Sequence, residues 1–88
     1  MEKLKALFNQ LEVAEAETLR LDSLVEENPE DETIEAEWDS AYKKEYDVKM
    51  SLANHIVSMT SGKIDLKTAN LMIQSRREQL KTLILKIA

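Results

Sequence analysis

Apolar residues recur every three or four positions through the first third of the chain, the spacing that places them on one face of an α-helix. With Leu4 taken as position a of a heptad, the a and d positions continue to Val25 and are polar only at Thr18. Charged side chains fill the positions between them, so the pattern predicts an amphipathic helix over residues 2–27. The stripe consists of Leu4, Leu7, Leu11, Ala14, Thr18, Leu21 and Val25.

Asn28-Pro29 predicts the end of this helix, because a residue that precedes proline avoids the α-helical region. The same pair can begin the next helix, with Asn28 as its N-cap and Pro29 in the first turn. A kink within one long helix is the alternative. We expect a reversal, because each apolar stripe needs a partner to bury it.

The second predicted helix covers residues 31–59 and has a wider apolar surface than the first. Two neighbouring stripes make up this surface, which is typical of a helix that touches two others. The first stripe is Ile34, Trp38, Ala41, Val48, Leu52, Ile56 and Met59. The second is Tyr42, Tyr46, Met50, Ala53 and Val57.

A second break is predicted at residues 60–65, where Gly62 suits a left-handed helix end and Asp65 suits an N-cap. A third helix over residues 66–87 follows, with Arg76 interrupting its apolar stripe. Short connections make successive helices antiparallel neighbours. The sequence therefore predicts an all-α single domain over residues 1–88, an elongated antiparallel three-helix bundle.

Glu45 and Arg76 both occupy positions where their helices otherwise carry apolar residues. In a hairpin centred near Gly62, Arg76 lies about one helical turn from Glu45. One interpretation is a buried pair that fixes the register of the two helices. The other is that both side chains extend to the edge of the bundle.

The composition argues against catalysis. The 88 residues include one Gly, one His and no Cys, which excludes disulfides, thiolate metal sites and a glycine-rich phosphate loop. His55 has no carboxylate or second histidine four residues away, and Glu35 with Asp39 belongs to an exposed acidic run. We therefore expect no catalytic residue, cofactor or metal site. The charged start of the chain and the lack of a long apolar run predict a cytoplasmic protein without membrane contact.

Charge is distributed unevenly along the chain. The formal net charge is -5, yet residues 62–88 carry six basic and two acidic side chains. Residues 26–39 carry eight acidic side chains and no Lys or Arg, and we call this segment, with its tryptophan, the acidic tip. It comprises Glu26, Glu27, Glu30, Asp31, Glu32, Glu35, Glu37 and Asp39, together with Trp38.

The acidic tip allows two interpretations. It is either a solvated turn or a docking surface for a basic protein, including one whose nucleic-acid-binding groove it fills in place of phosphates. Direct binding to nucleic acid is not expected, since affinity there rests on neutralising phosphates. Trp38, Tyr42 and Tyr46 recur on one helix face, which favours a core stripe over a ligand site. We expect one edge of this stripe to stay exposed near the tip, where Trp38 and the carboxylates could form a binding hot spot. The leading functional hypothesis is a small inhibitor or adaptor that docks on a basic partner.

Several large apolar side chains fall outside the predicted stripes and indicate a second buried surface. Self-association, as a homodimer for example, is one way to cover it, and a slender bundle gains stability by oligomerising. The alternative function is accordingly a self-assembling structural subunit. The residues are Leu19, Leu24, Leu71, Met72 and Leu85.

Two general resemblances can be noted. The Asn28-Pro29 break followed by the Tyr42–Tyr46 segment resembles the helical-hairpin subunits of secretion needles, although the third helix has no counterpart there. The acidic, glycine-poor character is similar to that of small phage-encoded inhibitors of host enzymes, a likeness of composition without a shared motif. It implies an inhibitory, protein-binding function.

Overall fold

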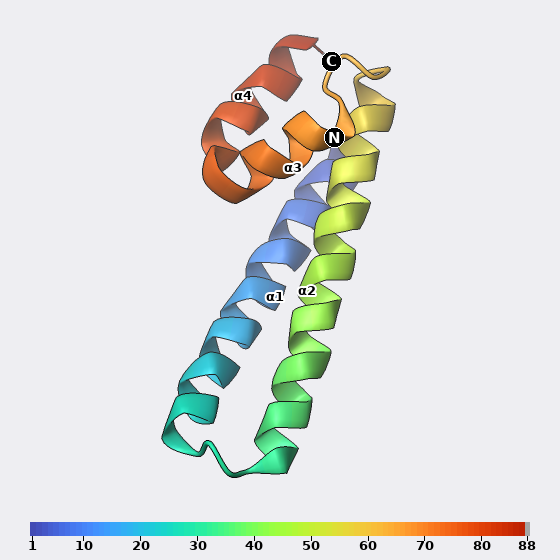
Figure 1. Ribbon diagram of the computed structural model, residues 1–88. Coiled ribbons are helices and arrows are strands. Elements are labelled where there is room, and N and C mark those ends of the chain that lie inside the picture. Colours follow the sequence, from blue (N-terminus) through green and yellow to red (C-terminus); the bar gives the residue numbers. More distant parts are fainter. Residues whose placement is uncertain (88) are drawn as a thin grey trace.

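The computed structural model describes residues 1–87 as four α-helices. They are α1 (Glu2–Glu27), α2 (Glu32–Met59), α3 (Leu66–Ser75) and α4 (Arg77–Ile87). α1 and α2 form a long antiparallel hairpin, and α3 and α4 pack on the end that holds the N-terminus (Figure 1). The described part measures 48 × 23 × 18 Å. The all-α class and the elongated shape are confirmed, whereas the predicted third helix is two helices.

The chain reverses after Glu27, as predicted, but the capping residues differ from the expectation. The side-chain amide of Asn28 donates to the Leu24 carbonyl at 3.1 Å, and its backbone N–H donates to the same oxygen at 2.9 Å. Asn28 therefore closes α1. Asp31 is the N-cap of α2, because its carboxylate accepts from the backbone N–H groups of Thr33 and Ile34.

The end of α2 uses the predicted glycine. Ser61 and Gly62 have positive φ values of 54° and 79°. The Gly62 N–H donates to the Val57 carbonyl at 2.9 Å, and the Ser61 N–H donates to Ser58, which together close the last turn. Asp65 caps α3, as predicted.

The hydrophobic core lies where α3 and α4 cover the hairpin. All four helices contribute to it, and the α2–α3 connection adds Ile64. Its burial supplies the main favourable free energy of folding. The core residues are Leu4, Leu7, Phe8, Leu11, Leu52, Ala53, Ile56, Ile64, Ala69, Ile73, Leu80 and Ile84.

α3 ends at Ser75, and its C-cap Arg76 leaves the helical region with a φ of -140° and a ψ of 48°, although neither a proline nor a glycine stands there. Side chains satisfy two carbonyls near this break. The Ser75 hydroxyl donates to the Leu71 carbonyl at 2.8 Å, and Nε of Arg77 donates to the Ile73 carbonyl at 3.1 Å. The break is thus a hydrogen-bonded turn within the fold.

This break determines what the hairpin exposes. A continuous helix over residues 66–87 would be about 33 Å long at 1.5 Å per residue and could cover much of the hairpin. Instead α4 turns back, so that Leu80 and Ile84 join the same core as Ile73. The half of the hairpin near the α1–α2 loop is covered by neither α3 nor α4 (Figure 1). We call residues 18–43 the distal hairpin.

Candidate protein-binding surface

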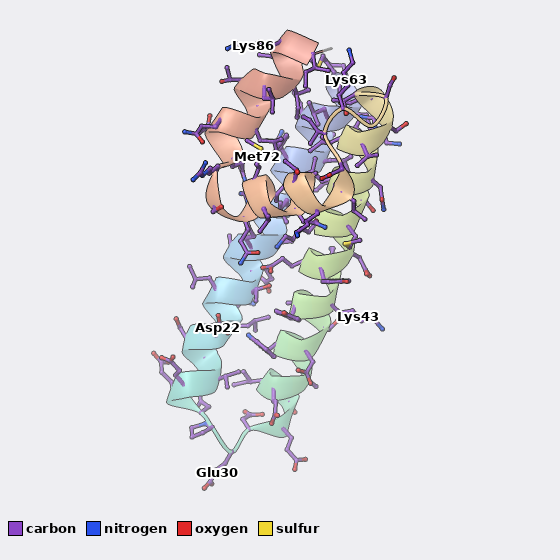
Figure 2. All side chains as sticks on the ribbon, turned by 45° about the horizontal axis from the view of Figure 1, so that its top comes forward. Asp22, Glu30, Lys43, Lys63, Met72 and Lys86 are labelled. Carbon is purple, nitrogen blue, oxygen red and sulfur yellow. The ribbon has the colours of Figure 1, made fainter. Side chains whose placement is uncertain are left out.

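The eight carboxylates of the acidic tip are all exposed. The salt bridges within residues 1–87 are Glu17–Arg20, Glu15–Arg77 and Glu78–Lys81, and none includes a residue of the tip. Figure 2 shows Glu30 at one end of the molecule and Lys63 and Lys86 at the other. The molecule therefore has an acidic end whose carboxylates form no salt bridge within residues 1–87, with Arg20 in electrostatic range of one of them, Glu37.

Helix dipoles favour only part of this charge. Glu32 and Glu35 lie in the first turn of α2, where negative charge is favourable. Glu26 and Glu27 lie in the last turn of α1, which carries no basic side chain, and there the dipole disfavours them. The carboxylates at the end of α1 therefore lack a stabilising role in the fold.

Trp38 connects the two helices of the distal hairpin. Its side chain is half-buried, and its indole Nε1–H donates to Oδ1 of Asp22 on α1. The Tyr42 ring stacks on the indole, with centroids 5.4 Å apart and planes inclined by 20°. Trp38 therefore packs in the seam between the helices and also supports an aromatic pair beside the seam.

The aromatic stripe is largely outside the core, contrary to the favoured interpretation. Tyr42 is 51% exposed and Tyr46 is 56% exposed. No third helix packs over these rings in the described residues, because the chain breaks at Arg76 and turns back. The exposed part of the stripe is thus Tyr42 and Tyr46, whereas Trp38, the stripe residue in the acidic tip, is half-buried.

A groove of about 390 Å³ runs beside the seam where these aromatics lie. Leu19, one of the residues assigned to an oligomer surface, forms part of it and is 68% exposed. No Lys or Arg is among the residues that line it. We call it the aromatic groove; its lining is Glu15, Thr18, Leu19, Asp22, Trp38, Tyr42 and Glu45.

The other flank of the seam has a different character. A shallow depression of about 960 Å³ is lined there by Val13, Ala16 and Ala41 among others, with Arg20 and Lys44 at its side. Arg20 is paired with Glu17 at 2.6 Å, and this hydrogen bond lowers the pKa of the Glu17 carboxyl. Positive and negative side chains are mixed on this flank. Of the two flanks of the seam, only the aromatic groove is lined by carboxylates without any Lys or Arg.

The pair between Glu45 and Arg76, one of the two interpretations of these residues, does not form, and a pair between Glu15 and Arg77 is present instead. Nη1 and Nη2 of Arg77 donate to the two carboxylate oxygens of Glu15 at 2.8 and 3.0 Å. This hydrogen bonding raises the pKa of Arg77, against the opposing effect of burial. Arg76 is exposed, because the break removes it from the helical register, and no salt bridge joins it to Glu45 within residues 1–87.

The apolar residues assigned to an oligomer surface are divided by the structure. Met72 packs against the core, and Leu24 is half-buried on α1. Leu71 and Leu85 are 59% and 68% exposed on α3 and α4. Leu19 lies in the aromatic groove, so these residues do not share one role.

The remaining chemistry is sparse. His55 is half-buried, and burial, followed by the charges of Lys3 and the N-terminal amine, lowers its pKa below 6.5. Within residues 1–87, no three His, Asp or Glu side chains are grouped so that they could hold a metal ion. None of the four described helices has the length and apolar character needed to cross a membrane.

The chain was compared with protein-family models, with curated proteins and with solved structures. None of the three comparisons gives a match. The features that distinguish this surface are its exposed carboxylates, which form no salt bridge within residues 1–87, and its exposed aromatic rings.

Proposed function

We propose that the protein is a non-catalytic binding module whose distal hairpin docks on a basic surface of another protein. The observation that carries this proposal is the acidic tip, whose eight carboxylates are exposed and form no salt bridge within residues 1–87. Two of them, Glu26 and Glu27, lie where the α1 dipole disfavours negative charge. Binding to a basic partner would relieve both the mutual repulsion and the unfavourable dipole interaction.

The shape of the hairpin supports the same function. Its distal half projects beyond the core, so the partner can approach it from several sides (Figure 1). Unpaired charge at the end of a projection accelerates association with a surface of opposite charge. Tyr42 and Tyr46 add exposed aromatic area close to the charges, which favours slow dissociation.

The sharpest form of the proposal is an inhibitor that occupies a nucleic-acid-binding groove. A projection that carries eight exposed carboxylates resembles a phosphate backbone in its density of negative charge. The same charge repels nucleic acid itself, so the partner is a protein. An adaptor would need the same acidic projection as this inhibitor. It would differ only in docking on the basic protein away from the groove that binds nucleic acid.

The test compares two variants with equal net charge in capture from a lysate of cells that naturally make the chain. Both carry three reversals, one set in the acidic tip and one outside the distal hairpin. Asp31, Glu32 and Glu35 are left unchanged because they support the start of α2. The tip variant is Glu26→Lys, Glu27→Lys and Glu30→Lys; the control variant is Glu2→Lys, Glu12→Lys and Asp47→Lys, at exposed carboxylates that form no salt bridge within the described residues.

We expect the wild type and the control variant to capture the same basic protein at low salt, and to release it at high salt. The tip variant is expected to capture none. Equal capture by both variants would show that the tip is not the docking site. Displacement of the partner's nucleic acid by the wild type distinguishes an inhibitor from an adaptor.

Self-assembly into a structural subunit is the second candidate, and one observation favours it. Leu71 and Leu85 expose large apolar side chains on α3 and α4, outside the distal hairpin. Light scattering over a concentration series measures the mass directly. A monomer at every concentration eliminates this candidate, whereas a mass that falls on Leu85→Glu substitution supports it.

A further inference from the structure

We propose that the aromatic groove binds an arginine side chain of the basic partner. This inference rests on the proposed function and names the chemical group that the site recognises. The groove combines two stacked rings, Trp38 and Tyr42, with the carboxylates of Glu15, Asp22 and Glu45. Carboxylates beside aromatic faces match a planar cation, which can stack on a ring and donate hydrogen bonds in its plane.

One carboxylate of this groove already binds a guanidinium. Arg77 donates from both terminal nitrogens to Glu15, at 2.8 and 3.0 Å. The carboxylates of Glu12 and Glu45 also raise the pKa of Arg77, which places Glu45 within electrostatic range of that guanidinium. Glu15, which lines the groove, therefore shows the paired, two-oxygen contact that arginine makes with carboxylates.

The rest of the groove keeps acceptors for a second cation. Glu45 is half-buried, and within residues 1–87 it forms no salt bridge. Asp22 accepts the indole Nε1–H of Trp38 at Oδ1, so its second oxygen can accept another donor. Because no Lys or Arg lines the groove, a cation from outside is the complementary occupant.

Arginine fits this arrangement better than lysine does. Its guanidinium presents donors along its edge and a flat, weakly hydrated face, whereas an ammonium is a compact and strongly hydrated charge. The Tyr42 ring is 51% exposed and lies against the indole, which provides an aromatic face next to the acceptors. An arginine that stacks here also brings its partner's surface within reach of the acidic tip.

The experiment uses the whole chain and two probes, hexa-arginine amide and hexa-lysine amide. Trp38 is the only tryptophan, so its indole Nε1–H resonance reports on the groove alone. The groove variants are Glu45→Gln, which keeps the side-chain shape, and Tyr42→Ala. The matched control is Tyr46→Ala, since Tyr46 is similarly exposed but does not line the groove.

We expect hexa-arginine to shift the Trp38 indole resonance and to bind about tenfold more tightly than hexa-lysine. Glu45→Gln and Tyr42→Ala should each remove most of this preference, and Tyr46→Ala should keep it. Glu45→Gln remains informative if Tyr42→Ala fails to fold, because it replaces one carboxylate oxygen by an amide of equal size.

Two results would overturn the inference, and each can be separated from failure of the proposed function. If both peptides bind equally and the indole resonance does not move, binding is by charge at the tip alone; loss of both peptides by the tip variant then leaves the proposed function standing. If neither peptide binds the wild type, the arginine site is absent, and the capture experiment with the tip variant decides the proposed function.

Discussion

Arg77 and Glu15 join the start of α4 to the middle of α1 through two hydrogen bonds of 2.8 and 3.0 Å. The same guanidinium donates from Nε to the Ile73 carbonyl near the end of α3. One side chain thus stabilises the break between α3 and α4 and fixes its position on the hairpin. This break leaves the distal hairpin uncovered by α3 and α4. The Arg77–Glu15 pair therefore helps to keep the proposed binding surface exposed.

Replacing Arg77 by glutamine should destabilise the protein, whereas the same change at Arg76 should not. Arg77→Gln removes a charged pair that is only partly exposed, so we expect the free energy of unfolding to fall by about 1–2 kcal/mol. Arg76 is exposed, and Arg76→Gln should change it by less than about 0.5 kcal/mol. Urea denaturation measures both. Equal effects of the two substitutions would contradict the structural role given to Arg77.

Reversing the charge of Glu27 should stabilise the fold. Lysine at the last position of α1 interacts favourably with the helix dipole and reduces repulsion within the tip. The expected gain is about 0.3–1 kcal/mol at low salt, and it should shrink as salt is added. Thermal unfolding at two salt concentrations measures it. A loss of stability would mean that Glu27 contributes to the fold after all.

His55 should titrate below pH 6.5, because burial disfavours its charged form and Lys3 and the N-terminal amine add to the effect. The unfolded chain then takes up the proton first as pH falls. The stability contributed by neutral His55 is therefore fully present above about pH 6.5 and is lost as pH falls through the lower pKa of the folded protein. An NMR titration of the imidazole gives the midpoint, and a value at or above 6.5 contradicts this account. In His55→Gln, this part of the pH dependence should be absent.

The contact between Trp38 and Asp22 should couple the two helices of the distal hairpin. Trp38→Phe keeps an aromatic ring and removes the Nε1–H donor, so we expect a loss of about 0.5–1.5 kcal/mol. Asp22→Asn keeps an acceptor and should cost less. A double-mutant cycle in urea measures the coupling between the residues, and strictly additive effects would show that the hydrogen bond contributes nothing.

The hairpin could be predicted from sequence because its determinants are local. The heptad spacing from Leu4 to Val25 defines α1, and Asn28-Pro29 marks the reversal. Gly62 and Asp65 likewise mark the next connection, since positive φ and N-capping depend on neighbouring residues.

The break at Arg76 could not be predicted in the same way. No proline or glycine stands there, and the interrupted stripe at Arg76 was equally consistent with a polar side chain in a continuous helix. The break is stabilised by tertiary contacts between residues that are distant in sequence. The main one joins Arg77 to Glu15, which are 62 residues apart. Tyr42 is exposed because this break leaves the rings uncovered. The aromatic groove therefore could not be predicted from the hydrophobic pattern either.

The distal hairpin is the surface proposed to meet a basic protein partner. Hydrogen–deuterium exchange of the chain, free and bound to the protein that it captures, maps the surface that the partner covers. We predict added protection in the distal hairpin, including the segment around Trp38, and unchanged exchange in α3 and α4. Protection confined to α3 and α4, around Leu71 and Leu85, would show that the partner binds elsewhere than the distal hairpin.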